Sequence, residues 1–110
     1  MLFKPEHKYL ILDGKKTVTR RVWKKPMVKI GGIYKCKLKM LSKDYFAKIK
    51  VTKFFKQRLG DMNQEDVLKE GYKWNYEFMD IWKKINGIYD PVLEVDVIEF
   101  EVVKDSKSVK

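Results

Sequence analysis

The feature that most constrains the fold is a segment in which apolar residues and lysines alternate without interruption. From Tyr34 to Met40 every second residue is apolar, and each residue between them is a lysine. Because successive side chains of a β-strand point to opposite faces, this period of two predicts a strand over Ile33–Met40 with one buried face. The residues expected on that buried face are Tyr34, Cys36, Leu38 and Met40.

The next segment repeats this alternation after a polar turn at residues 41–44. Ala47, Ile49 and Val51 are expected to face inward, so the two segments predict an antiparallel hairpin. Like charges directly opposite one another destabilise a sheet, so we expect an anion or widely splayed strands on the outer face. Its lysines could follow a phosphate backbone, or they could simply keep an exposed sheet from aggregating. These lysines are Lys35, Lys37, Lys39, Lys48 and Lys50.

Three other parts of the chain have helical signals. Pro5 and Gly14 flank a short apolar run, and they are typical of the first turn and the end of a helix. After Gly60 the period changes, and two asparagines stand where they could cap helices. The predicted helices cover Glu6–Asp13, Asn63–Glu70 and Asn75–Asn86. The apolar positions of the last follow helical spacing, and they are Phe78, Ile81, Trp82 and Ile85.

Two further strands complete the expected fold, one over Thr17–Val22 and a long one over Val92–Val103. In the long strand the apolar positions change phase after Val97, so one face cannot hold them all without an extra residue. We therefore predict a bulge near Val97–Ile98. Bulged long strands are typical of small closed barrels, so we expect an α+β fold with a mostly antiparallel barrel of five or six strands and three short helices.

Size and charge limit the class of protein. The 110 residues fit one domain, expected at residues 1–104 with a flexible tail at 105–110. Lys and Arg number 25 against 15 Asp and Glu, which favours a polyanion such as RNA as partner. The single Cys36 and single His7 offer no disulfide and no usual Cys/His zinc site, so we predict no metal or cofactor. The absence of a signal peptide or membrane-spanning run predicts a cytoplasmic protein.

The segment after the first predicted helix is the main functional candidate. It combines a glycine, two hydroxyls and four cations within eight residues, a composition suited to an anionic or polar ligand such as a nucleotide. Trp74 is the best candidate for stacking on a base. The candidate binding residues of this segment are Lys15, Lys16, Thr17, Thr19, Arg20 and Arg21.

These residues resemble a known family. The spacing Gly14-x-Lys16-x-x-Thr19-x-Arg21 resembles the signature of ASCH domains, which belong to the PUA-like superfamily. The likeness covers nearly the whole chain, although Gly32 stands where the family often has aspartate. Further matching segments are Lys29–Gly32, Arg58–Asp61, Glu65–Tyr72, Phe78, Trp82 and Val97–Phe100. The resemblance implies a small barrel with helices at its opening and a role in binding RNA.

The resemblance also implies a second function. Some bacterial members are amidohydrolases that remove the acyl group of N4-acetylcytidine with a lysine, a threonine and a glutamate. By motif position these would be Lys16, Thr19 and Glu70. The lysine could activate the threonine hydroxyl if burial or nearby cations lower its pKa. The alternative is that Lys16 only pairs with Glu70 and keeps a high pKa.

Three functions therefore stay open on the sequence alone. The first is binding of RNA or a nucleotide-like ligand in an electropositive cleft. The second is hydrolysis of a modified nucleoside in the same cleft. The third is a regulatory adaptor that binds a protein partner through the helices after Gly60.

Overall fold

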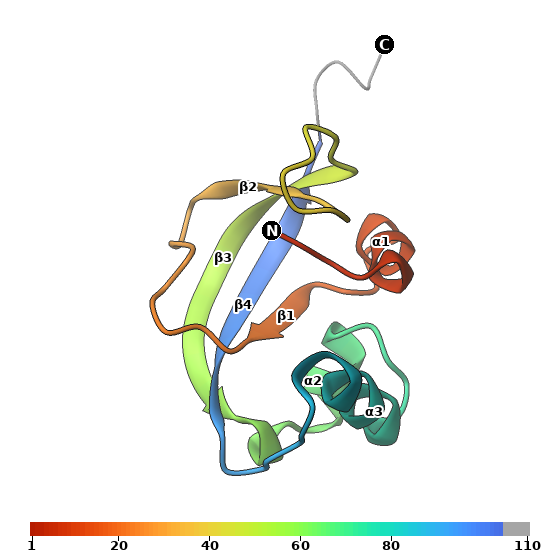
Figure 1. The fold of residues 1–110 in the computed structure, drawn as a ribbon, viewed down its shortest axis with the longest axis vertical. Coiled ribbons are helices and arrows are strands. Elements are labelled where there is room, and N and C mark those ends of the chain that lie inside the picture. The colour runs from red at the N-terminus through yellow and green to blue at the C-terminus, as the bar shows by residue number, and fades with distance from the viewer. Residues whose placement is uncertain (105–110) are drawn as a thin grey trace.

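A computed structural model describes residues 1–104, and the predicted tail at 105–110 lies outside the described residues. The described part forms one curled antiparallel sheet with helices on its concave side (Figure 1). The strand order is β1 (Val18–Arg21), β4 (Glu94–Val103), β3 (Ala47–Arg58) and β2 (Ile33–Cys36). The α+β prediction is confirmed, but within these residues the sheet has four strands rather than five or six.

The three predicted helices are present. They are α1 (Pro5–Leu12), α2 (Gln64–Lys69) and α3 (Asn75–Asn86), and a short 3-10 helix, η1 (Leu59–Asp61), precedes α2. The Asn63 side chain accepts a hydrogen bond from the Asp66 backbone N–H, so its predicted capping role is confirmed. The predicted cap by Asn75 is wrong, because α3 already begins at that residue. Here the Glu77 carboxylate instead accepts from the backbone N–H of Trp74, at 2.9 Å.

The predicted first strand of the hairpin is shorter than expected. β2 ends at Cys36, which is fully buried as predicted, whereas Leu38 and Met40 are exposed. The strand pattern continues in the sequence, but the chain leaves β3 after Cys36 and pairs with the N-terminal segment. Lys37 forms an isolated parallel bridge with Leu2. The apolar residues beyond it therefore do not join the buried face of the sheet.

The lysines of the hairpin have neighbours that the sequence pattern did not indicate. Lys35 lies directly opposite Lys48, as a facing pair of like charges. Lys50, however, lies opposite Glu101 on the other neighbouring strand, β4. The chain itself therefore supplies a carboxylate opposite one of these lysines, whereas the facing pair Lys35 and Lys48 has none across the strands.

The predicted bulge is in the wrong strand. The register shifts between Val51 and Lys53 in β3, and β4 pairs without a bulge at Val97–Ile98. β4 accommodates both apolar sets because it is a central strand that is buried on both faces. Val97 packs with the helices, whereas Ile98 packs against a separate cluster around Val51.

Candidate functional site

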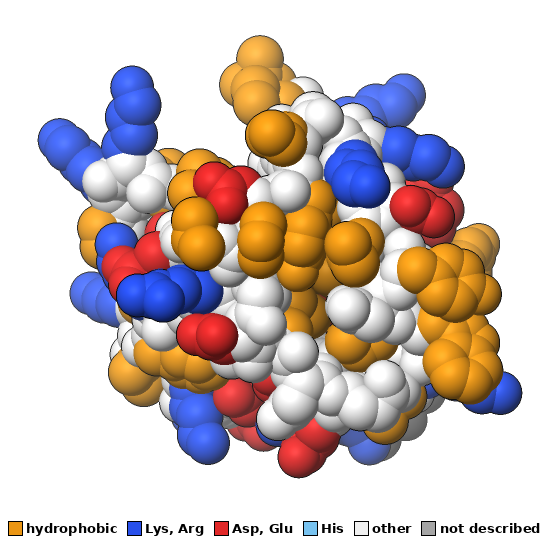
Figure 2. Space-filling model, turned by 90° about the horizontal axis from the view of Figure 1, so that it is seen from below, with side chains coloured by type: hydrophobic (Ala, Val, Ile, Leu, Met, Phe, Trp, Pro, Cys, Tyr) orange, Lys and Arg blue, Asp and Glu red, His pale blue; other side chains and the backbone are white. Residues whose placement is uncertain are grey.

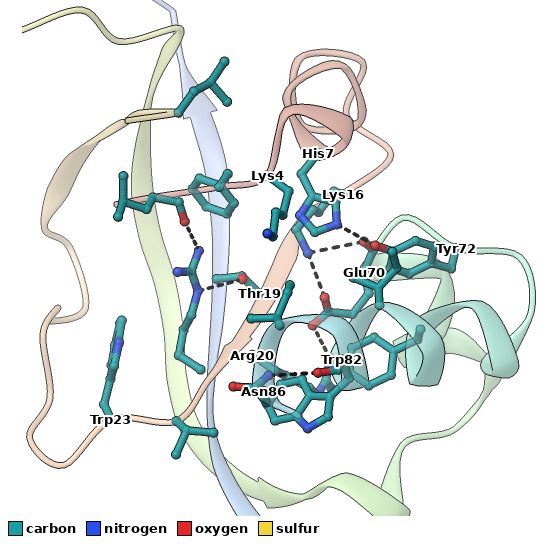
Figure 3. Close-up of a pocket in the computed structure, with 18 of the residues that line it drawn as sticks. Lys4, His7, Lys16, Thr19, Arg20, Trp23, Glu70, Tyr72, Trp82 and Asn86 are labelled. Atoms are coloured by element: carbon teal, nitrogen blue, oxygen red, sulfur yellow. Dashed lines mark hydrogen bonds and ion pairs between the residues drawn. The ribbon is translucent and has the colours of Figure 1, made fainter. Parts of the chain in front are cut away.

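A cavity of about 470 Å³ opens between the N-terminal segment, β1 and α3. Its size is within the range typical of small-molecule sites. Figure 3 shows side chains from α1, β1 and the helices around it, and Figure 2 shows a hollow lined by hydrophobic side chains between groups of Lys and Arg. Four cationic side chains and one carboxylate line the cavity, and they are Lys4, Lys16, Arg20, Arg21 and Glu70.

Lys16 forms the centre of a buried ionic cluster. Its side chain is 2% exposed, and its Nζ donates to Glu70 Oε1 at 2.7 Å. Two backbone oxygens, those of Val18 at 2.9 Å and Glu70 at 3.3 Å, accept its other hydrogen bonds. A lysine ammonium has three donors, so all of them are used within the protein. Lys16 therefore contributes charge and rigidity to the pocket rather than a free hydrogen bond.

The backbone beside this cluster needs a glycine. Gly71 has a φ of +100°, which side chains rarely adopt. A Cβ there would also lie 3.0 Å from Leu10 Cδ1 and 3.3 Å from Lys16 Cβ. The glycine therefore lets the chain after α2 approach Lys16 closely enough for Glu70 to pair with it.

Glu70 also binds a second cation. Arg20 Nη1 donates to Glu70 Oε2 at 2.8 Å, and Arg20 Nη2 donates to Gln57 Oε1 at the same distance. The carboxylate thus bridges two buried cations, and Arg20 links β1 to both α2 and β3. Glu70 itself is 3% exposed. Burial of these charges is tolerated because each is paired and hydrogen-bonded.

Thr19 lies in the same pocket but bonds to a different partner. Arg21 Nε donates to Thr19 Oγ1 at 3.2 Å, and Arg21 Nη2 donates to the Leu2 carbonyl at 2.7 Å. The guanidinium also lies over the Phe3 ring, 4.7 Å from its centroid. Within residues 1–104, no hydrogen bond joins Thr19 to Lys16. The three residues implied by the family resemblance share a pocket, but only Lys16 and Glu70 are hydrogen-bonded to one another.

Burial lowers the pKa of Lys16 below its ordinary value. The ion pair with Glu70 acts in the opposite direction, and Arg21 and Arg20 lower the pKa further. The sequence suggested either a free lysine with a lowered pKa or a paired lysine with a high one. In the structure Lys16 is paired with Glu70 and its pKa is still lowered, because desolvation by burial outweighs the effect of the ion pair.

His7 and Tyr72 form a second polar pair at the pocket. His7 is 7% exposed, and its Nε2 is hydrogen-bonded to the Tyr72 hydroxyl. Burial is the main cause that lowers the His7 pKa to about 4, and it also raises the pKa of Tyr72. Sequence reasoning missed His7 as a pocket residue, since it considered only that a lone histidine cannot form a zinc site. The signal that could have found it is the helical spacing of His7 and Ile11, which form the buried face of α1.

The apolar stripe predicted on α3 forms one wall of the cavity. Phe78 and Trp82 are buried there, and Ile85 lies nearer the opening, where it is 49% exposed. Trp23 lies across the cavity from Trp82 in Figure 3, and its ring packs edge-on against Phe54. The pocket therefore has two tryptophans, neither of which is Trp74.

The structure gathers some of the predicted site residues and separates others. Lys16, Thr19, Arg20, Arg21 and Glu70 all line the cavity. The remaining ones are absent from its lining, namely Lys15, Thr17, Lys35, Lys37, Lys39, Lys48, Lys50 and Trp74. Among the described residues, no group of three His, Cys, Asp or Glu side chains could hold a metal ion.

Comparison with known proteins identifies the fold. No family sequence model and no curated protein sequence matches the chain. In structure, it is similar to an ASCH domain from Lactobacillus crispatus, with a TM-score of 0.69 and 15% identity over 86% of this chain and 69% of that one. It is also similar to the ASCH protein of Zymomonas mobilis, with a TM-score of 0.63 and 13% identity over 94% of this chain and 68% of that one.

A third similar structure is the hypothetical protein PH0355, with a TM-score of 0.69 and 21% identity over 92% of this chain and 94% of that one. Identities this low establish the fold alone. The chain has the ASCH domain fold, as the sequence motifs predicted. Within residues 1–104, no helix combines the length and apolar character needed to cross a bilayer.

Proposed function

We propose that the pocket binds one nucleobase with its sugar, either in a free nucleotide or as an unstacked base of RNA. The observation that carries this proposal is the convergence of Lys16, Thr19, Arg20, Arg21 and Glu70 on one cavity of about 470 Å³. Its walls include Trp23 and the α3 stripe, and apolar walls with a few polar groups are typical of sites for such ligands.

Arg21 is the cation best placed to contact the ligand. Lys16 and Arg20 donate to Glu70 and to other protein oxygens. Arg21 uses two of its donors, on Thr19 and the Leu2 carbonyl. A guanidinium has five N–H donors, so three are left for a phosphate or a base edge. Arg21 would thus bind the anionic or polar part of the ligand.

The hairpin offers a path for the rest of an RNA strand. Leu38 and Met40 line the opening of the cavity, and Lys37 and Lys39 stand next to them in the chain. A strand whose base enters the pocket could therefore continue over these lysines through phosphate contacts. In this proposal Lys37 and Lys39 bind the phosphates of an RNA strand whose base occupies the pocket.

Calorimetric titration with cytidine 5′-monophosphate and with a short single-stranded RNA tests the proposal. Both should bind, and Arg21→Gln should weaken both. Loss of one charged hydrogen bond corresponds to roughly tenfold in affinity. The matched control is Arg58→Gln, because this exposed arginine does not line the cavity. If neither ligand binds, or if the two variants lose affinity equally, the pocket is not the binding site.

We propose amidohydrolase activity as a second function of the same pocket. It is supported by the lowered pKa of Lys16 and by the shared location of Lys16, Thr19 and Glu70. A proton passed from Lys16 to Glu70 would give a neutral amine and a protonated carboxyl. The Thr19 hydroxyl would then attack the acyl carbonyl and lose its proton to Lys16, and Glu70 would give its proton to the leaving amine. Water would then release the acyl group as a carboxylate and regenerate the threonine.

This reaction requires a local rearrangement. Lys16 must first lose a proton and release one of its present acceptors, such as the Val18 carbonyl, in order to reach Thr19. The test is release of cytidine and acetate from N4-acetylcytidine, with Thr19→Val as the inactive variant. Absence of turnover by the wild-type protein over a broad pH range would exclude the hydrolase and leave the binding proposal standing.

A further inference from the structure

The pocket contains one polar pair that neither proposed function uses. His7, from α1, and Tyr72, which follows α2, both line the cavity. Their rings meet edge-on, with centroids 6.0 Å apart and an interplanar angle of 72°. Figure 3 shows the His7 ring between Lys4 and Tyr72, with one ring nitrogen joined to the tyrosine hydroxyl. The pair is therefore held in one orientation by packing and by a hydrogen bond.

A neutral phenol can donate to a neutral imidazole or accept from it, so the direction of that bond depends on the tautomer of His7. Burial raises the pKa of Tyr72, so the phenol keeps its proton and can donate it. The His7 pKa of about 4 reflects burial and the nearby cations Lys16 and Arg21, against the opposing effect of Glu70 and Glu6. At neutral pH the imidazole is thus neutral, with one donor and one acceptor nitrogen. In the arrangement in which the phenol donates to Nε2, the imidazole proton is on Nδ1.

In that arrangement the Nδ1–H group makes no hydrogen bond to the protein within residues 1–104, where the ring is joined only to Tyr72 through Nε2. The same group belongs to a side chain that lines the cavity, so its hydrogen bond is available to whatever occupies the pocket. A neutral donor has a different preference from the surrounding cations. Cations attract phosphates and carboxylates, whereas a neutral imidazole N–H fits an uncharged acceptor without adding to the local charge.

We propose that His7 recognises an uncharged acceptor on the ligand through its Nδ1–H, and that Tyr72 fixes the tautomer that makes this possible. The inference rests on the proposed binding function, and it adds the chemical feature of the ligand that His7 recognises. That feature is a carbonyl oxygen or an unprotonated ring nitrogen, as on the pairing edge of a pyrimidine. His7 is then a specificity residue, and Tyr72 is a positioning residue.

The tautomer can be measured without any ligand. His7 is the only histidine in the chain, so the imidazole ¹⁵N signals of the labelled protein report on this ring alone. Their chemical shifts distinguish a protonated from an unprotonated nitrogen. We expect a protonated Nδ1 and an unprotonated Nε2 at pH 7, and a mixture of tautomers in Tyr72→Phe. A protonated Nε2 in the wild-type protein would overturn the inference, whatever the protein binds.

Binding provides the second test, with cytidine 5′-monophosphate as the probe. His7→Phe keeps a ring but removes the donor, and we expect affinity to fall roughly five- to tenfold, as for one lost hydrogen bond. Tyr72→Phe should give a smaller loss, because the correct tautomer is still partly populated. The matched control is Tyr76→Phe, since Tyr76 is 62% exposed and does not line the cavity. It should bind like wild type.

The outcomes separate this inference from the function on which it rests. If the wild-type protein does not bind the nucleotide, the proposed function fails and the role of His7 fails with it. If the wild-type protein binds, Arg21→Gln binds weakly and His7→Phe binds normally, only the role of His7 is refuted. A fall in affinity for Tyr76→Phe equal to that for Tyr72→Phe would also refute it.

Discussion

The pocket and the hairpin use the same residue type in opposite ways. In the pocket, Lys16 is 2% exposed and all its donors are satisfied by protein oxygens. On the hairpin, Lys50 is exposed and faces Glu101 across the strands without a close ion pair. Of these two lysines, only Lys16 is part of the buried core. A count of cations along the chain therefore does not show where charge is structural and where it is available to a partner.

The largest difference between the two regions should be in stability. Lys16→Met removes a buried charge and leaves Glu70 with one cationic partner, Arg20, so we expect a loss of about 3 kcal/mol in the free energy of unfolding. Lys50→Met should change it by less than about 0.5 kcal/mol. Urea denaturation of both variants measures this contrast. Equal effects would mean that the buried cluster does not stabilise the fold.

A second contrast concerns pH. The His7 pKa falls from 6.5 to about 4 on folding, so between these values the unfolded chain binds more protons than the folded one. Stability should therefore decrease as pH falls through this window, by up to about 3 kcal/mol in total. The hairpin has no histidine and should not contribute there. In His7→Gln the dependence on pH between 6.5 and 4 should be shallower, as measured by denaturation at a series of pH values. Parallel curves for the two proteins would contradict this.

Features that depend on local sequence could be predicted, whereas features that depend on pairing between distant segments could not. Helical spacing located α3 closely, and the flanking Pro5 and Gly14 located α1, because both signals are local properties of the sequence. Periodicity also gave the correct inward residues of β3, such as Ile49. It failed at Leu38 and at the supposed bulge, because both depend on which distant segment pairs with a strand. Burial of β4 on both faces is a property of the assembled sheet.

The candidate site was predicted in part for a similar reason. Lys16, Thr19 and Glu70 were found through motif spacing, and the cavity includes all three. His7 and Trp23 were not predicted to line it. The spacing of His7 and Ile11 indicates that His7 is buried, but burial alone does not separate a pocket wall from ordinary core packing. Trp74 was favoured for stacking because of its neighbours in sequence, and it lies away from the cavity with 51% exposure.

The next test separates the two regions by salt dependence. Changing Lys37 and Lys39 to glutamine should reduce the slope of log affinity against log salt for a single-stranded RNA, by about 0.7 for each phosphate that is no longer neutralised. The affinity for cytidine 5′-monophosphate should not change, because neither lysine lines the cavity. The matched control is the double change of Lys83 and Lys84 to glutamine on α3. If this control gives the same reduction, the path over the hairpin is wrong.

The smallest expected effect comes from the facing pair of like charges on the hairpin. Lys35 and Lys48 are cross-strand neighbours, and both lie near the Tyr45 ring, at 5.1 and 5.6 Å from its centroid. Lys35→Glu replaces repulsion with attraction, so we expect a gain in stability of roughly 0.2–1 kcal/mol at low salt.

Salt provides the internal check on that gain. Exposed charges are screened at high ionic strength, so the gain should shrink when salt is added. Lys39→Glu makes the same charge change beyond the end of β2, and it should leave stability unchanged. A loss in Lys35→Glu would show that the contacts of the lysines with Tyr45 outweigh their mutual repulsion. The two lysines would then stabilise the hairpin, as Lys16 stabilises the pocket, and the contrast between the regions would be one of degree.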